Sequence, residues 1–201
     1  MAEEIVFYHN PRSRSQMVHW MLEEAGAPYR IVPIDFEKGE HKAPSFLAIN
    51  PMGKLPTIVH RGVVVTETAA IIAYIADTFP QAGLAPRSED PQRGTYYRWL
   101  FFGAGCFEPA LLDKMMNRPE VARKAAVGWG SYDEVVATLK QALAGGPYLL
   151  GEAFSAADVY VGSEIRFAIM FGAPGLKGEK VFDDYIARLS ARPAAQRTTA
   201  G

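Results

Sequence analysis

The chain has 201 residues, of which 49% are hydrophobic and 21% are charged, and its formal net charge is −1. These values are typical of a soluble globular protein and too apolar for a disordered chain. The near balance of 21 basic and 22 acidic residues argues against a nucleic-acid-binding surface, which needs a basic excess. The length predicts one compact body or two small domains.

The single cysteine, Cys106, excludes an internal disulfide and a cysteine-rich metal site, and it fits a reducing compartment. The acidic first residues lead directly into a strand signal, unlike the basic start and apolar core of a secretory signal. No apolar run approaches the roughly 18 residues of a membrane-spanning helix. We therefore expect a cytoplasmic protein with no membrane span and no bound metal.

Residues 1–79 alternate between strand and helix signals. Short apolar strands are predicted over residues 5–8 and 29–34, on either side of a helix that ends at Gly26. Ser13 or Ser15 is expected to cap this helix. A helix between two such strands predicts a parallel βαβ unit. The helix has one apolar stripe, formed by Val18, Met21, Leu22 and Ala25.

The remainder of this region predicts a hairpin and a second helix. Residues 57–60 and 63–65 are β-branched runs separated by two residues that end in Gly62, which is typical of a tight antiparallel turn. Thr66 is expected to cap a helix over residues 67–78. The order βαβ then ββα predicts a four-stranded mixed sheet with helices packed on it.

After residue 79 the strand signals end. Residues 80–91 contain three prolines and no periodicity, and we interpret them as a linker between residues 1–79 and an all-helical domain over residues 92–201. The expected fold class is therefore α/β plus all-α. Helices are predicted over residues 92–116, 120–143, 155–171 (beginning with a Ser155/Asp158 capping box) and 180–190 (ended by Arg192-Pro193).

Four sequence segments carry a family resemblance. They are residues 8–15 (YHNPRSRS), 50–56 (NPMGKLP), 66–71 (TETAAI) and 154–158 (FSAAD). In this order and spacing they resemble the glutathione transferase family, and the first is most similar to its bacterial and fungal branch of serine/tyrosine type. The resemblance implies a thioredoxin-like glutathione-binding domain, a C-terminal helical bundle and a homodimer.

The resemblance also implies how glutathione is held. Leu55-Pro56 falls where the family has a cis-proline, so the Leu55 backbone is expected to pair with the cysteinyl part of glutathione. Glu67 and Thr68 open a helix whose N–H groups suit the γ-glutamyl carboxylate, with Glu67 accepting from the γ-glutamyl ammonium.

Two further residues are candidates for the opposite end of glutathione. Lys54 and His41 lie where a cation or donor for the glycine carboxylate is expected. Both residue types also occur commonly in solvated loops, which is the alternative interpretation for each.

Several residues are candidates to donate a hydrogen bond to the thiol of glutathione. An unperturbed thiol, with a pKa of about 8.5, is only about 3% ionised at pH 7, and a hydrogen bond lowers that pKa. Ser13 falls where serine-type members have their hydroxyl, and Tyr8 falls where tyrosine-type members have theirs. We expect Ser13 to donate the hydrogen bond to the thiolate, with Tyr8 as the alternative. Ser15 and the Arg14 guanidinium also lie nearby. Arg14 occupies the place of the cysteine in cysteine-type members, which argues against a mixed disulfide there.

Three functions follow from this resemblance. The first is transfer of glutathione to a small apolar electrophile, the second a glutathione-dependent peroxidase or disulfide reductase, and the third a binding module without catalysis. An apolar wall for the second substrate is expected after the linker. The candidates for that wall are Trp99, Phe101, Phe102, Phe107, Met115 and Met116.

Overall fold

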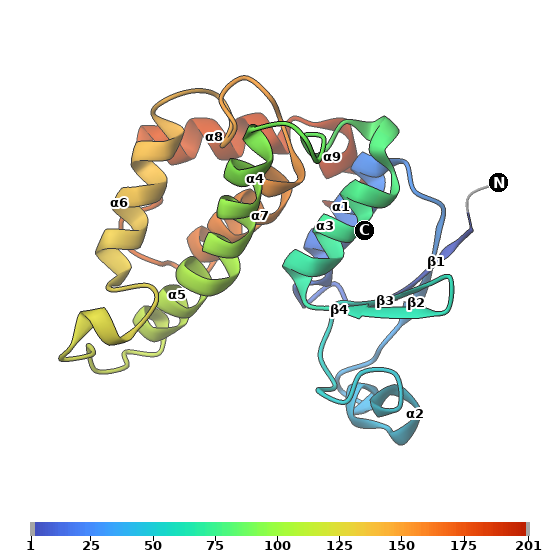
Figure 1. Ribbon diagram of the computed structural model, residues 1–201. Helices are drawn as coiled ribbons and strands as arrows, with labels where there is room; N and C mark the ends of the chain where they lie inside the picture. The colour runs from blue at the N-terminus through green and yellow to red at the C-terminus, as the bar shows by residue number, and fades with distance from the viewer. Residues whose placement is uncertain (1–2, 200–201) are drawn as a thin grey trace. The chain divides into compact units, whose positions relative to one another are not determined.

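A computed structural model describes residues 3–199 and divides the chain into two compact units. The first comprises residues up to Leu84 together with the segment that begins at Pro193, and the second runs from Ala85 to Arg192. The division after Leu84 falls inside the proline-rich segment 80–91. Figure 1 shows the strands in the first unit and the run of helices in the second.

The first unit is built on a four-stranded mixed sheet. Its strands are β1 (Ile5–His9), β2 (Tyr29–Pro33), β3 (Thr57–His60) and β4 (Val63–Thr66), in the order β2-β1-β3-β4. β1 pairs in parallel with β2, whereas β3 is antiparallel to both β1 and β4. The predicted βαβ-ββα arrangement is confirmed.

One face of the sheet is covered by α1 (Ser15–Ala25) and α3 (Thr68–Thr78), which lie side by side in Figure 1. Phe7 of β1 points toward these helices, with its ring 6.1 Å from that of His19 in α1. The predicted apolar stripe of α1 is buried. The helix ends at Gly26, whose φ of 58° is the left-handed conformation that glycine adopts at low cost.

The other face of the sheet is covered by a shorter segment. A 3₁₀ turn, η1 (Glu40–Lys42), is followed by α2 (Pro44–Leu47). Phe46 of α2 is buried, and its ring centroid lies 5.5 Å from that of Tyr8 in β1. A small core therefore forms beneath the sheet from Phe46, Leu55, Ile34, Tyr8 and Phe36.

The last helix, α9 (Pro193–Thr199), belongs to the first unit, although the sequence places residues 193–199 with the helical domain. Pro193 does end the pattern of the preceding helix, but it also occupies the first position of the next one, where its missing N–H costs nothing. Arg197 of α9 donates to Glu23 of α1 at 2.5 Å, which joins the two helices.

The second unit consists of α4 (Gln92–Phe102), α5 (Glu108–Met115), α6 (Tyr132–Leu143), α7 (Ala156–Met170) and α8 (Lys180–Ser190). α7 is buried along most of its length and packs against α4 and α8. Across residues 3–199, no helix combines the length and the apolar character that crossing a membrane requires.

A π-helical segment, η3 (Gly103–Phe107), joins α4 to α5 and interrupts the uniform helix predicted over residues 92–116. The N–H of Glu108 donates to the Gly103 carbonyl, five residues back. Pro109 has no N–H for the regular bond in the next position. A Cβ on Gly103 would lie 2.7 Å from a carboxylate oxygen of Glu164 and 2.7 Å from the Tyr160 ring, both in α7, so a larger residue would force these side chains to move.

The predicted helix over residues 120–143 is wrong in its first half. α6 begins at Tyr132, and Ser131 caps it by accepting the N–H of Glu134 at 3.3 Å. Before that cap the chain is irregular apart from a single 3₁₀ turn, η4 (Lys124–Ala126). Gly130, with a φ of 65°, breaks the helical path that the apolar spacing suggested.

The predicted capping box at the start of α7 is confirmed, and its acid lies at the centre of the unit. Asp158 is fully buried and accepts hydrogen bonds from the Ser155 backbone N–H at 2.9 Å and the Leu149 N–H at 2.8 Å. Burial raises the pKa of its carboxyl, and these hydrogen bonds act in the opposite direction. The side chain thus links α7 to the loop that precedes it.

Candidate functional site

The strand register brings the predicted site residues to one edge of the sheet. Tyr8 pairs with Thr57, and Thr57 pairs with Thr66. His9 pairs with Pro33 on the other side of β1. The carboxyl ends of β1, β2 and β4 and the beginning of β3 therefore meet at the same edge.

The segment entering β3 presents an unpaired peptide group at this edge. The Leu55-Pro56 bond is cis, as expected. The Lys54 carbonyl accepts from Asn50 Nδ2 at 2.9 Å and from Thr57 Oγ1 at 3.1 Å, which holds the segment in place. Within residues 3–199, the Leu55 N–H and C=O have no hydrogen-bond partner.

The segment leaving β4 forms the start of α3. Thr66 is the last residue of β4, so the expected cap by Thr66 is wrong: Glu67 occupies the N-cap position, with a φ of 65° and no side-chain cap. The first bond of this helix runs from the Ile71 N–H to the Glu67 carbonyl, and the N–H groups of residues 68–70 therefore have no acceptor within it. Glu67 is exposed and Thr68 is buried.

The loops that carry His41 and Lys54 meet at Gly53. A Cβ on Gly53 would lie 2.5 Å from the His41 carbonyl oxygen, so the two backbones nearly touch. The His41 ring packs edge-on against Phe36 at 4.9 Å, and its buried Nδ1 has no hydrogen-bond partner among residues 3–199. Lys54 is exposed, and within that same range its ammonium has no partner.

Ser13 lies in the loop between β1 and α1 and belongs to a hydrogen-bonded cluster. Its Oγ lies 2.8 Å from the Asn10 carbonyl and 2.7 Å from Ser15 Oγ, and it accepts the Ser15 N–H at 3.1 Å. The N-cap position of α1 is Arg14, which makes no side-chain cap. The expected capping by a serine side chain therefore takes a different form, because Ser13 accepts the N–H of the first helical residue.

His9 joins this cluster, although no sequence motif points to it. Its Nδ1 lies 2.7 Å from Ser15 Oγ. Burial, and then the neighbouring His19, lowers the pKa of His9 from 6.5 to about 4, so the ring is neutral near pH 7. The available signal was the strand alternation, because His9 falls on the same buried face as Ile5 and Phe7.

Tyr8, the alternative donor, lies on the opposite face of β1 from His9. Its ring packs against Phe46, and its hydroxyl has no hydrogen-bond partner in the described part of the chain. Ser13 and Tyr8 therefore approach the same sheet edge from different faces. Arg14 is half-buried between Ser13 and the first turn of α1.

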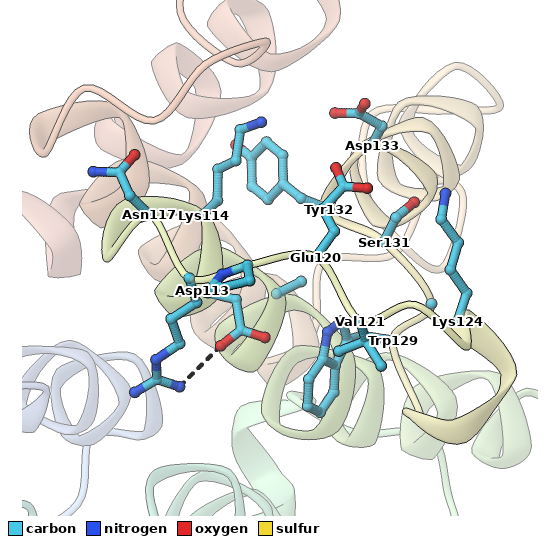
Figure 2. A pocket seen from close by; sticks show the side chains of 14 residues that line it. Asp113, Lys114, Asn117, Glu120, Val121, Lys124, Trp129, Ser131, Tyr132 and Asp133 are labelled. Carbon is cyan, nitrogen blue, oxygen red and sulfur yellow. Dashed lines mark hydrogen bonds and ion pairs between the residues drawn. The ribbon is translucent and has the colours of Figure 1, made fainter.

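A separate cavity of about 270 Å³ lies within the second unit, and it contains none of the predicted site residues (Figure 2). In Figure 2 the dashed line joins Asp113 to Arg118, an ion pair of 2.9 Å. Three acidic and three basic side chains line it, so the cavity favours neither sign of ligand charge. Its charged lining residues are Asp113, Lys114, Arg118, Glu120, Lys124 and Asp133.

The expected apolar wall divides into core and surface residues. Trp99 and Phe107 are buried, whereas Phe101 and Met116 are 70% and 59% exposed.

Between residues 3 and 199, no cluster of three or more histidine, cysteine, aspartate or glutamate side chains could hold a metal ion.

The structure thus belongs to the fold class of a thioredoxin-like sheet followed by a helical unit, and comparison with known proteins identifies the family. The profile of the glutathione S-transferase N-terminal domain matches residues 3–77. Glutathione S-transferase 3 of Zea mays is 30% identical over 192 residues, which cover 90% of this chain and 86% of the maize protein. The chain therefore belongs to the glutathione S-transferase family.

Two further relatives bear on the chemistry. A glutathione transferase family member from Pseudomonas fluorescens Pf-5, crystallised with two glutathione molecules bound, has a TM-score of 0.81 and 28% identity, with 98% of this chain and 92% of that chain covered. The disulfide-bond oxidoreductase YfcG of Escherichia coli is 28% identical over 166 residues, 77% of this chain and 76% of that protein.

Proposed function

We propose that the protein is a glutathione transferase that binds glutathione at the described sheet edge and activates its thiol for attack on a small apolar electrophile. The observation that carries this proposal is the gathering of three kinds of group at adjacent strand ends. These are the Ser13 hydroxyl, the Leu55 peptide and the N–H groups of residues 68–70, and the last two have no hydrogen-bond partner among residues 3–199. Removal of reactive apolar compounds, that is detoxification, is the role we assign.

The γ-glutamyl end of glutathione binds at the start of α3. Its carboxylate accepts from the free N–H groups and the Thr68 hydroxyl, because a helix N-terminus attracts anions. The exposed Glu67 carboxylate accepts from the γ-glutamyl ammonium. The cysteinyl peptide pairs with the Leu55 N–H and C=O beside Pro56, as a strand adds to an open edge.

The glycine end binds at the loops that meet at Gly53. The Lys54 ammonium supplies a charge-assisted bond to the glycine carboxylate. His41 supplies a second donor, and the support for this role is its buried Nδ1, which has no partner within residues 3–199. The two residues come from different loops, so the contact between those loops positions both.

The thiol is activated by a hydrogen bond from Ser13. Such a bond to an anion contributes about 1.5–3 kcal/mol, which lowers a thiol pKa by roughly one to two units. The thiol proton passes to solvent; the thiolate then forms an S–C bond while the leaving group departs with its bonding electrons. Tyr8 is the alternative donor, and the Arg14 guanidinium adds positive charge that favours the thiolate.

A second candidate function is reduction of glutathione mixed disulfides, which the similarity to the oxidoreductase YfcG favours. The bound thiolate attacks the glutathionyl sulfur of the mixed disulfide. Glutathione disulfide forms, and the released thiolate takes a proton from water. No protein cysteine is required. With a hydroperoxide, the same thiolate forms an S–O bond as the O–O bond breaks, the alkoxide leaves and takes a proton, and a second glutathione converts the sulfenic acid to glutathione disulfide and water.

Calorimetry and parallel assays test the proposal. We expect glutathione to bind the full chain below millimolar concentration, and conjugation of an aryl halide to exceed turnover of an organic hydroperoxide or a mixed disulfide. Binding without any turnover would identify a non-catalytic module. Absence of binding at millimolar glutathione would overturn the proposal.

We also propose that the protein is a cytoplasmic homodimer. β4 is an outer strand of the sheet, and its residues Val63 and Val64 are 55% and 42% exposed. This exposure supports a partner subunit packed along β4. Light scattering on the purified chain tests the dimer, and a monomer at micromolar concentration would contradict it.

A further inference from the structure

Three short contacts connect His9 to the loop that carries Ser13. His9 Nδ1 lies 2.7 Å from Ser15 Oγ, Ser15 Oγ lies 2.7 Å from Ser13 Oγ, and Ser13 Oγ lies 2.8 Å from the Asn10 carbonyl oxygen. Each separation is that of a hydrogen bond and needs one proton between its two atoms. The two hydroxyls supply one proton each, and the carbonyl supplies none. A fourth contact, of 2.9 Å, joins Ser15 Oγ to the same carbonyl. A proton on His9 Nδ1 serves three of these four contacts, whereas a proton on Nε2 would leave only the two hydroxyl protons for all four, so the geometry favours the Nδ1 tautomer.

The proton on His9 Nδ1 sets which atom donates in each hydrogen bond from His9 through Ser15 and Ser13 to the Asn10 carbonyl. Ser15 Oγ accepts from His9 Nδ1 and from the Asn10 N–H at 3.1 Å, which fills both of its acceptor positions. Its single proton can then go to Ser13 Oγ at 2.7 Å or to the Asn10 carbonyl at 2.9 Å. Two hydroxyl oxygens 2.7 Å apart repel each other unless one donates, and Ser13 already has the Asn10 carbonyl as its acceptor, so we assign the Ser15 proton to Ser13.

The Ser13 hydroxyl likewise acts as a hydrogen-bond donor. Its Oγ accepts from the Ser15 N–H and from the Ser15 hydroxyl, so its own proton must point away from both. Without a ligand that proton goes to the Asn10 carbonyl. The same carbonyl also accepts the Ser13 N–H at 3.0 Å and keeps this bond when the hydroxyl turns toward a thiolate.

The other tautomer of His9 would reverse the series. With the proton on Nε2, Nδ1 would accept from Ser15, and Ser15 would accept from Ser13. Ser13 would then direct a lone pair, rather than a proton, toward an approaching sulfur anion. Because His9 is neutral near pH 7, it carries a single N–H, and the position of that proton decides which arrangement forms.

We propose that His9 is a positioning residue, which acts through Ser15 to fix the Ser13 hydroxyl as a hydrogen-bond donor to the glutathione sulfur. This inference rests on the proposed function, in which Ser13 makes that bond. His9 does not touch the substrate in this account. Its effect is to remove the orientation of Ser13 in which an oxygen lone pair faces the thiolate.

The test is a titration of the bound thiol, followed by the ultraviolet absorbance of the thiolate in the full-length protein saturated with glutathione. His9→Phe keeps a ring but removes the donor, and we expect the thiol pKa to rise by roughly half to one unit. His9→Asn places an amide donor close to the position of Nδ1 and should restore the wild-type value. His19→Phe, which changes the adjacent ring but no contact with Ser15, is the matched control and should titrate as wild type.

A double-mutant cycle separates positioning from general damage to the fold. Ser15→Ala interrupts the series, so His9→Phe combined with Ser15→Ala should raise the thiol pKa no further than Ser15→Ala alone. If His9→Phe does not fold, Ser15→Ala carries the test by itself. A wild-type thiol pKa in Ser15→Ala, or additive shifts in the double variant, would overturn the inference.

Ser13→Ala distinguishes this inference from the proposed function. If Ser13→Ala raises the thiol pKa and His9→Phe does not, the positioning role of His9 fails while the role of Ser13 stands. If neither variant changes the thiol pKa although glutathione binds, the assignment of Ser13 fails, and the inference about His9 fails with it.

Discussion

The hydroxyl of Tyr185, in α8, donates a hydrogen bond to Oδ1 of Asp158, in α7, at 2.9 Å. Both side chains are almost completely buried. The same carboxylate accepts from the loop before α7, so one acid connects two helices and a loop of the second unit. Its role is therefore structural.

Asp158→Ala should destabilise the protein strongly. The substitution leaves the N–H groups of Leu149 and Ser155 buried without their acceptor, at a cost of about 1–3 kcal/mol for each group. Thermal unfolding followed by circular dichroism measures the effect. Asp184→Ala is the control, because its pair with Lys180 is solvent-exposed and contributes at most about 1 kcal/mol. An unchanged melting temperature in Asp158→Ala would refute this role.

The stability of the protein should fall as the pH drops from about 6.5 to about 4. Burial, and then His19, lowers the pKa of His9 from 6.5 to about 4, so the unfolded chain binds a proton in this range and the folded chain does not. His9→Phe should show a weaker pH dependence of the unfolding free energy in this window. Denaturant titrations at several pH values measure it, and an identical slope in both proteins would contradict the burial of a neutral His9.

Glutathione affinity should depend on the start of α3. Thr68→Val removes one hydroxyl donor, and we expect a loss of roughly two- to tenfold in affinity, the equivalent of a neutral hydrogen bond. Glu67→Ala removes an ionic acceptor and should cost about tenfold or more. Calorimetry gives both values, with Glu89→Ala in the second unit as the control. Wild-type affinity in Glu67→Ala would remove this residue from the site.

Gly53 should be essential for the loops that carry His41 and Lys54. Gly53→Ala places a Cβ 2.5 Å from the His41 carbonyl, and we expect it to weaken both stability and glutathione binding. Gly39→Ala is matched in conformation, since both glycines have positive φ, but no atom lies within 4 Å of its new Cβ. That control should lose only about 1 kcal/mol from backbone strain. Equal effects in the two variants would show that the close approach is unimportant.

Local patterns predict most of the fold, and they fail where a competing local signal or a distant contact decides. The stripe on α1 and its end at Gly26 are properties of a single segment, and both are confirmed. The apolar spacing of residues 120–131 also resembles a helix, but positive φ at Gly130 and the cap at Ser131 delay its start. The assignment of α9 to the first unit depends on Arg197 reaching Glu23, far away in the sequence, which no local pattern reveals.

In the candidate site, too, motifs predict some features, and others depend on contacts that no motif reveals. The cis bond before Pro56 was expected from a motif, and the register between Thr57 and Thr66 then brings it to the edge where Glu67 lies. His9 was missed because its importance comes from a contact with Ser15 across a turn rather than from a motif. Alternation along β1 places a polar ring on a buried face, and this was the available signal.

Titration of the thiol of bound glutathione in wild type, Ser13→Ala and Tyr8→Phe tests the central claim most directly. We predict a thiol pKa roughly one to two units higher in Ser13→Ala than in wild type, little change in glutathione affinity, and more than tenfold slower turnover. Tyr8→Phe should titrate as wild type. A wild-type pKa in Ser13→Ala, together with a raised one in Tyr8→Phe, would contradict the account and assign the activation to the tyrosine.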